Sequence, residues 1–285
     1  MTPVPLPAPN TLTALLPLLA LCALLLSTLA IFAVRCAALG RPRTPYIASR
    51  AMPAFWKWFM EWWVWLWGPV ERACLALGVS PNAITFASTS LAGIAAVLLG
   101  FGYLSVGGWV YLFGASLDLV DGRVARAQGS ASKAGAFLDS TLDRVAELLV
   151  FAALTVHFRD TVAIYAALAA AGSSVMVSYA RARGEALGVE HEASVGGMQR
   201  AERVVLTGLP CALSPLFDLL LGAGNGGWAV GSALGFLAAV TSLTALRRGH
   251  AIWRALRGAP ALKPGERANV RWLDPMRRRE KRPGS

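Results

Sequence analysis

Five acidic residues occupy the stretch LDLVDGRVARAQGSASKAGAFLDSTLDRVAE, residues 117–147, in a chain that is otherwise mostly apolar. Asp118 and Asp121 lie three residues apart, and Asp139 and Asp143 lie four apart, so each pair would share one face of a helix. The turn that links the two helices is short, which makes them antiparallel neighbours. The spacing therefore predicts that four carboxylates meet in one pocket.

A pocket of four carboxylates needs positive charge. At a separation of about 4 Å, two like charges repel by roughly 4 kcal/mol even at an effective dielectric constant of about 20. Oxygen ligands on facing helices suit Mg²⁺ or Mn²⁺, which keep open positions for substrate phosphates. Gly122, Ala125 and Gly135 leave space beside the backbone, and Arg126 could hold a phosphate with both arms of its guanidinium group. The pattern predicts a metal site for a phosphorylated ligand.

Each part of this pattern also has a purely structural explanation. Two aspartates on one helix occur at solvated helix ends, and small residues in membrane helices usually serve helix packing. Their combination on two adjacent helices favours the binding site over these explanations.

The composition is that of a membrane protein with several spans. Of the 285 residues, 55% are hydrophobic and 15% are charged, whereas a soluble domain carries about a quarter charged residues. The apolar runs are continuous, which favours one helical bundle over a β-barrel. We expect seven membrane helices, at about 11–34, 83–102, 105–127, 135–157, 160–182, 202–222 and 228–247.

Basic residues indicate how these helices are oriented. Lys and Arg gather in alternate connections and in the C-terminal tail, and by the positive-inside rule these segments are cytoplasmic. The protein is therefore expected in the cell (inner) membrane, with its N-terminus outside and the acidic site at the cytoplasmic face. The net charge is +11, and the Lys and Arg residues that produce it flank the apolar spans. A nucleic-acid-binding domain would carry them along one face, so nucleic acid is not an expected partner.

The segment AMPAFWKWFMEWWVWLWGPVERACLALGVS, residues 51–80, is crowded with tryptophan. A membrane span is possible here, but tryptophan at this density favours a helix lying in the headgroup layer. Ser80 and Pro81 then mark the start of a new helix. Four regions result: an N-terminal anchor at 1–45, an interfacial helix at 46–80, a six-helix catalytic bundle at 81–250 and a basic cytoplasmic tail at 251–285.

The acidic stretch resembles the signature of a known family. DLVDGRVARAQGSASKAGAFLDSTLD matches the pattern D-x2-D-G-x2-A-R-x8-G-x3-D-x3-D of the CDP-alcohol phosphatidyltransferases at all eight fixed positions. The likeness extends over about 70–250, as six helices after an interfacial one, and leaves the first apolar run outside it.

The resemblance implies a metal-dependent transfer of a phosphatidyl group from CDP-diacylglycerol to a polar alcohol, with release of CMP. It implies two divalent ions, Mg²⁺ or Mn²⁺, held by Asp118, Asp121, Asp139 and Asp143, with Asp143 as the base that deprotonates the acceptor. Family members are typically homodimers. The residues implied to bind the CDP-linked lipid are Asn82, Ala83, Ile84, Thr85, Gly122, Ala125, Arg126, Ser132 and Gly135.

A second stretch, SYARARGEA followed by RAER, bears on the acceptor. It is similar to the family branch that uses inositol phosphate, from which it departs at Gly184 and Ala201 without losing a charge. Its arginines and Lys133 would surround the cytoplasmic side of the site. Such a ring of positive charge suits an acceptor that carries phosphate. We therefore favour inositol phosphate over glycerol 3-phosphate, while serine or another alcohol stays open. The expected acceptor residues are Lys133, Arg181, Arg183, Arg200 and Arg203.

Two other classes of protein share part of this pattern. A prenyltransferase of the UbiA type also sets aspartate pairs against a diphosphate, but it would lack the Gly-x2-Ala-Arg segment. A divalent cation transporter would place acidic residues at several depths, whereas here they gather in one cluster. Release of CMP distinguishes the enzyme from the transporter.

Overall fold

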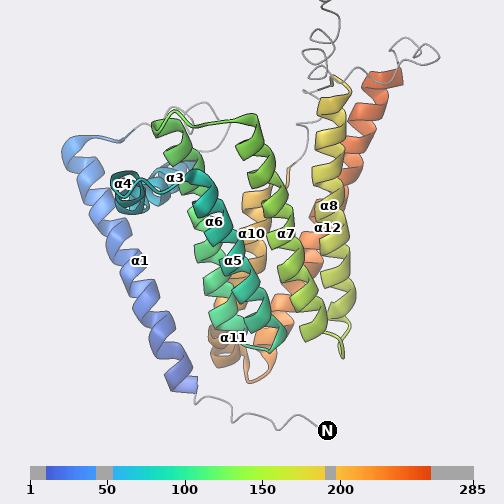
Figure 1. Cartoon of the computed structure of the whole chain (residues 1–285). Coiled ribbons are helices and arrows are strands. Elements are labelled where there is room, and N and C mark those ends of the chain that lie inside the picture. The colour runs from blue at the N-terminus through green and yellow to red at the C-terminus, as the bar shows by residue number, and fades with distance from the viewer. Residues whose placement is uncertain (1–10, 43–53, 190–196, 258–285) are drawn as a thin grey trace, which may run out of the picture.

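A computed structural model describes residues 11–42, 54–189 and 197–257, and these residues form helices and turns without a strand (Figure 1). The predicted all-α architecture is confirmed. The helices are α1 (Thr11–Leu39), α3 (Ala54–Leu66), α4 (Gly68–Ala76), α5 (Pro81–Gly100), α6 (Leu104–Ala127), α7 (Lys133–His157), α8 (Ala163–Ala186), α10 (Arg200–Ala212), α11 (Ser214–Leu221) and α12 (Asn225–Arg257).

The long helices from α5 onward stand side by side as an upright bundle (Figure 1). Its core is built from aliphatic residues and alanines of all these helices, among them Leu99, Val150 and Leu234. Small residues bring the backbones close together. A Cβ atom on Gly108 of α6 would lie 2.4 Å from the backbone nitrogen of Ala212 in α10, so α6 and α10 touch backbone to backbone.

Several helices are long and apolar enough to cross a membrane. Within the described residues, α1, α5, α8 and α12 meet this criterion individually, and α10 with α11 meet it as a pair. Helices α6 and α7 have 24 and 25 residues and stand among them, although they carry the acidic residues. The expectation of an integral membrane protein is confirmed.

The prediction of one continuous helix at 202–222 is wrong. The chain bends by 53° between α10 and α11. Pro215 lies in the first turn of α11, where its missing N–H and its ring prevent the helix from continuing through this point. The last helix differs as well, because it runs to Arg257 and so beyond the predicted end at 247. The rest of the predicted tail lies outside the described residues.

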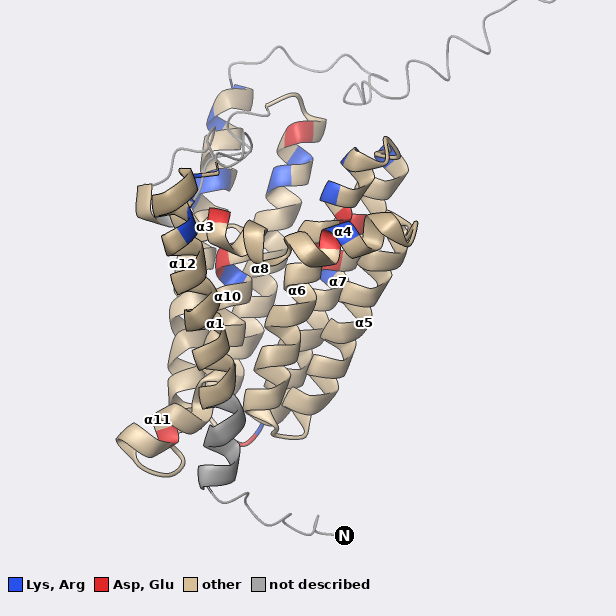
Figure 2. Ribbon diagram, turned by 90° about the vertical axis from the view of Figure 1, so that its left-hand side faces the viewer, with Lys and Arg blue, Asp and Glu red and all other residues tan. Residues whose placement is uncertain are grey.

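The tryptophan-rich segment forms two short helices, α3 and α4, which run across the upright helices (Figures 1 and 2). The 13 residues of α3 span about 20 Å, which is less than the hydrocarbon layer of about 30 Å. Its length and direction therefore agree with an interfacial helix. Helix α1 stands beside this pair at the edge of the molecule and also contacts α11 (Figure 1).

Charge is distributed unevenly along the bundle. Lys and Arg gather toward the end at which α6 finishes and α7 begins (Figure 2). At the opposite end, Arg159 pairs with the adjacent Asp160 at 3.2 Å. The acidic motif is thus close to the basic end.

Candidate functional site

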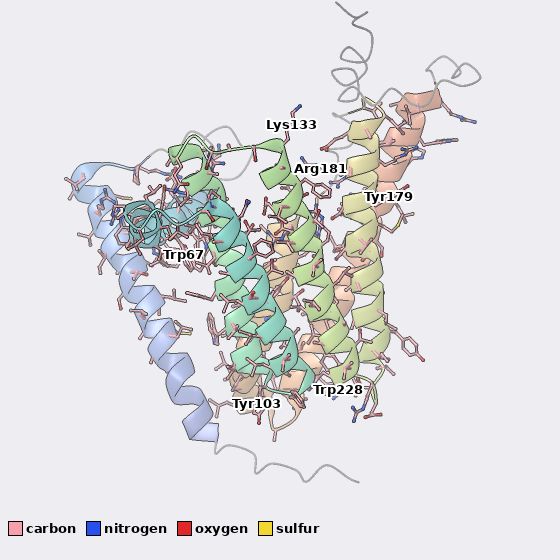
Figure 3. The ribbon with its side chains drawn as sticks, viewed as in Figure 1. Trp67, Tyr103, Lys133, Tyr179, Arg181 and Trp228 are labelled. Carbon is pink, nitrogen blue, oxygen red and sulfur yellow. The ribbon has the colours of Figure 1, made fainter. Side chains whose placement is uncertain are left out.

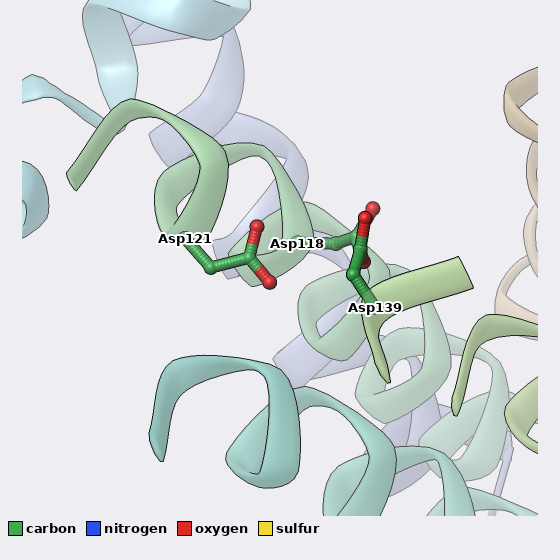
Figure 4. Close-up of side chains that lie close together, drawn as sticks. All are labelled: Asp118, Asp121 and Asp139. Atoms are coloured by element: carbon green, nitrogen blue, oxygen red, sulfur yellow. The ribbon is translucent and has the colours of Figure 1, made fainter. Parts of the chain in front are cut away.

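Three carboxylates from two helices meet near the basic end of the bundle. Asp118 and Asp121 come from α6 and Asp139 comes from α7, and one oxygen of each lies within 4.8 Å of the others. Figure 4 shows the three side chains converging on one space. The short α6–α7 connection and the helical spacing of the residues place them there, as the sequence predicts.

A hydroxyl group from a third helix orients one of these carboxylates. Thr85 of α5 donates a hydrogen bond of 2.7 Å to Oδ2 of the buried Asp121. Ser80 caps the start of α5 by accepting a bond from the backbone N–H of Ala83 at 3.3 Å. The helix start at Ser80 thus positions Thr85 one turn further on, against the acidic cluster.

Two oxygens of the cluster have no hydrogen-bond donor among the residues that the structure describes. Oδ1 of Asp118 and Oδ1 of Asp139 are buried, and neither accepts a hydrogen bond from any residue that the structure describes. Buried carboxylate oxygens without a donor are costly unless a cation is close. These oxygens, with the nearby Asp121, fit a divalent metal ion that prefers hard oxygen ligands.

Arg200 of α10 links this cluster to the fourth aspartate. Its guanidinium group donates to Oδ2 of Asp118 at 2.5 Å and contacts Oδ1 of Asp143 at 2.6 Å. Asp143 is therefore joined to the cluster through Arg200 and is not one of the three carboxylates that lie within 4.8 Å. Its other oxygen, Oδ2, lies 3.9 Å from Arg144.

Three of the predicted CDP-lipid residues, Asn82, Ser132 and Gly135, lie together at the start of α7. Ser132 caps α7 by accepting a bond from the N–H of Gly135 at 3.1 Å. A Cβ atom on Gly135 would lie 3.3 Å from the Ser132 hydroxyl and 3.8 Å from the Asn82 side-chain oxygen, so α5 and α7 approach each other here. A Cβ atom on Gly122 would lie 3.3 Å from the Arg126 guanidinium group.

The remaining three residues of this set have different surroundings. Ile84 is buried in an apolar cluster with Trp67, Val120 and Val124, so its side chain contributes packing. Ala83 is exposed and Ala125 is half-buried.

The five predicted acceptor residues do not form one continuous ring. Lys133 and Arg181 are exposed, and Figure 3 shows them toward the same end of the molecule. Arg183 is exposed as well, while Arg181 forms an ion pair of 2.8 Å with Glu185. Arg200 turns inward to the aspartates.

Arg203 turns inward to a residue that sequence reasoning left without a role. It is 3% exposed and donates two hydrogen bonds, of 2.6 and 3.0 Å, to the carboxylate of Glu147. The sequence shows both residues as charges beside apolar runs. It does not predict that they pair, because 56 residues separate them in the chain.

Known proteins resemble this chain over about two thirds of its length. Residues 78–246 match the family model described as CDP-alcohol phosphatidyltransferase. The phosphatidylinositol phosphate synthase of Mycolicibacterium smegmatis is 34% identical over 191 residues, which cover 65% of this chain and 82% of the relative. The protein of the same name from Mycobacterium tuberculosis is 33% identical over 193 residues, with coverages of 65% and 84%.

The fold is also similar to crystal structures of the Mycobacterium tuberculosis phosphatidylinositol phosphate synthase. The structure with CDP-DAG bound has a TM-score of 0.57 and 29% sequence identity, and the match covers 65% of this chain and 92% of that one. The complex with manganese and citrate has a TM-score of 0.60 and 28% identity, with coverages of 71% and 97%.

Proposed function

Because the chain belongs to the CDP-alcohol phosphatidyltransferase family, we propose that it transfers the phosphatidyl group of CDP-diacylglycerol to inositol phosphate and releases CMP. The observation that carries this proposal is the cluster of Asp118, Asp121 and Asp139, whose oxygens lie within 4.8 Å at the family's own motif. The relatives named phosphatidylinositol phosphate synthase support the choice of acceptor.

The proposed cofactor is a pair of divalent ions, Mg²⁺ or Mn²⁺, bound by Asp118, Asp121, Asp139 and Asp143. The two buried oxygens without a donor in the described chain support this assignment, as does the manganese complex of the related structure. Bound ions would neutralise the charge of the diphosphate and of the departing CMP. The hydrogen bond from Thr85 holds one oxygen of Asp121 in place, which supports its proposed role as a ligand.

Asp143 is the proposed base for the acceptor hydroxyl. Arg200 holds its Oδ1 atom, and the proposed step uses Oδ2, which lies 3.9 Å from Arg144. In the proposed step, Oδ2 takes the hydroxyl proton while the acceptor oxygen attacks the lipid-side phosphorus. The bond from that phosphorus to the bridging oxygen breaks, and CMP departs with that oxygen.

The nucleotide end of the CDP-lipid is proposed to lie against Asn82, Ser132 and Gly135, where α5 and α7 approach each other. Gly122 leaves the backbone of α6 open beside Arg126, whose guanidinium group can bind a phosphate. The other residues of this proposed site are Ala83, Ile84, Thr85 and Ala125.

The acceptor phosphate is proposed to bind between α7, α8 and α10. Lys133, Arg181 and Arg183 supply exposed positive charge, while Arg200 and Arg203 supply charge from inside the bundle. Arg203 is held rigidly by Glu147, so we propose that it orients this part of α10 as well as contributing its charge. Glycerol 3-phosphate is the alternative acceptor.

We further propose that the site faces the cytoplasm and that the N-terminus lies outside. The gathering of Lys and Arg at the site end of the bundle supports this orientation. The start of α1 lies at the opposite end (Figure 1). We also propose a homodimer, because members of the family are typically homodimers.

Release of CMP by the purified protein tests the proposed function. CDP-diacylglycerol and Mg²⁺ or Mn²⁺ are supplied, and inositol phosphate, glycerol 3-phosphate, free inositol and serine are added one at a time. Release that depends on inositol phosphate is the expected result. Release with glycerol 3-phosphate instead would keep the reaction and replace the acceptor. Absence of both nucleotide binding and release would favour the divalent cation transporter.

A further inference from the structure

We propose that α1 is a positioning element for the CDP-lipid side of the site, which it reaches through α3 and α4. Helix α1 lies outside the matched family region of residues 78–246. This inference rests on the proposed function, because it concerns the affinity of the same site for its lipid substrate. Two sets of contacts carry it, one between α1 and α3 and the other between α4 and α6.

The first set fastens α3 to α1 and to the residues just after it. Phe32 of α1 is fully buried, and its ring lies 5.5 Å from each of the Trp58 and Trp65 rings of α3. Arg41 forms an ion pair with Glu61 of α3, a carboxylate with only 4% of its side chain exposed. Arg41 also donates to the backbone oxygen of Ala54 at 3.4 Å.

The ion pair between Arg41 and Glu61 specifies the rotation of α3 about its own axis. Most of α1 faces outward, since only 6% of its apolar window is buried. A tryptophan-rich helix can lie at a membrane interface in many rotations, because its rings accept both environments. A buried carboxylate is costly away from its partner. Glu61 therefore favours the one rotation of α3 that brings it to Arg41.

The second set of contacts packs the α3–α4 junction against α6, the helix that carries Asp118 and Asp121. Trp67 packs its ring 5.2 Å from that of Phe113 in α6 and belongs to one apolar cluster with Val120 and Val124. Figure 3 shows Trp67 between α1 and α6. Glu71 of α4 accepts a hydrogen bond of 2.6 Å from Arg123.

These contacts surround the residues proposed to bind the CDP-lipid. Val120 and Arg123 are the immediate neighbours of Asp121 and Gly122 in the chain. Ile84 packs in the same apolar cluster as Trp67, and it adjoins Thr85, the hydroxyl donor to Asp121. A change in the rotation of α3 is thus transmitted to the α5 and α6 turns that face the lipid nucleotide.

Charge reversal across the first contact tests this inference in the full chain. The variants are Arg41→Glu, Glu61→Arg and the double variant with both changes. Arg35→Glu, at an exposed position on α1, is the matched control for altered charge near the membrane. Each protein is assayed for CMP release at varied CDP-diacylglycerol and, separately, at varied inositol phosphate.

Each single reversal should raise the KM for CDP-diacylglycerol by about 3- to 10-fold, and the double variant should return to within about twofold of the wild type, because only the pair restores the attraction. The KM for inositol phosphate should stay unchanged, since the proposed acceptor arginines lie on α8 and α10. Arg35→Glu should behave as the wild type.

Three outcomes would overturn the inference: an unchanged lipid KM in both single variants, an equal rise in both KM values, or a double variant without rescue. If a single reversal prevents folding, as judged by size exclusion and thermal unfolding, Phe32→Leu and the neutral double variant Arg41→Gln with Glu61→Gln provide the comparison. Both should raise the lipid KM and leave the KM for inositol phosphate unchanged, because the first removes a ring contact with α3 and the second removes the attraction between Arg41 and Glu61. Wild-type turnover shows that the proposed function stands even where this inference fails.

Discussion

The two oxygens of Asp118 have different surroundings. Oδ2 accepts a hydrogen bond from Arg200 at 2.5 Å, while Oδ1 is buried without a donor among the described residues. A carboxylate placed in this way can hold a protein cation on one side and a metal ion on the other. Asp139 also has a buried oxygen without a donor, and it contributes no ion pair of its own within the described chain.

Replacing either residue should weaken metal binding. Asp118→Asn or Asp139→Asn should lower the affinity for Mn²⁺ by at least about 10- to 100-fold, the loss known even for residues that only support a ligand. Electron paramagnetic resonance of free Mn²⁺, recorded without substrate, measures this affinity. Asp160→Asn is the control, because Asp160 is exposed at the opposite end of the bundle. An unchanged affinity in both variants would contradict the assigned metal site.

Asp143 is expected to behave differently from these two. Asp143→Asn should lower kcat by about 10²- to 10⁴-fold through loss of the base. Some nucleotide binding should survive, because Asp118, Asp121 and Asp139 remain together. Steady-state CMP release and equilibrium binding of a CDP-lipid measure the two effects. Wild-type turnover by this variant would remove Asp143 from the reaction.

At the scale of elements, an ion pair joins α7 to α10. Arg203→Gln would leave the buried Glu147 without a cation, so the free energy of unfolding should fall by about 3–5 kcal/mol. The KM for the acceptor should rise as well, because α10 also carries Arg200. Thermal unfolding in detergent and CMP release at varied acceptor measure both effects.

Two comparisons distinguish this pair from an ordinary surface contact. Combining Arg203→Gln with Glu147→Gln should recover much of the lost stability, since neither buried charge remains. Glu185→Gln breaks the exposed pair with Arg181 and should change stability by less than about 1 kcal/mol. A stable Arg203→Gln protein with an unchanged acceptor KM would contradict both roles of Arg203.

Helices α6 and α10 depend on a close backbone contact. Gly108→Ala would bring a methyl group to 2.4 Å from the Ala212 nitrogen, so the helices must separate. The expected loss of stability is about 1–3 kcal/mol, and kcat should fall because Arg200 moves away from Asp118. Gly172→Ala on α8 meets no atom within 4 Å and is the matched control. Equal melting temperatures for the two variants would disprove this contact.

At the scale of the molecule, the distribution of charge predicts the orientation in the membrane. A fluorescent protein fused to the C-terminus should fluoresce inside the cell, and a tag at the N-terminus should be cleaved by protease added outside. The physical reason is the gathering of Lys and Arg at the end of the bundle that holds the acidic motif. Protection of the N-terminal tag in spheroplasts, where added protease reaches the outer face of the inner membrane, would reverse the proposed orientation.

Local periodicity explains why so much of the site could be predicted from sequence. Helical spacing puts Asp118 and Asp121 on one face, and a short turn brings Asp139 beside them, as the structure finds. The break between α10 and α11 was missed, although Pro215 was visible in the chain. Its effect depends on whether neighbouring helices accommodate a bend, which a local pattern does not specify.

By itself, the sequence determined that this protein is an all-helical membrane protein with a family motif whose carboxylates converge, because those features depend on residues within a few helical turns of one another. Only the tertiary structure decided which charges are paired. Arg200 could have reached an acceptor alone, but packing of α10 against α6 sets it on Asp118, 82 residues away. The Arg203–Glu147 and Arg41–Glu61 pairs were decided in the same way. Charged residues far apart in the chain pair according to which helices are neighbours, and spacing along the chain does not predict which helices those are.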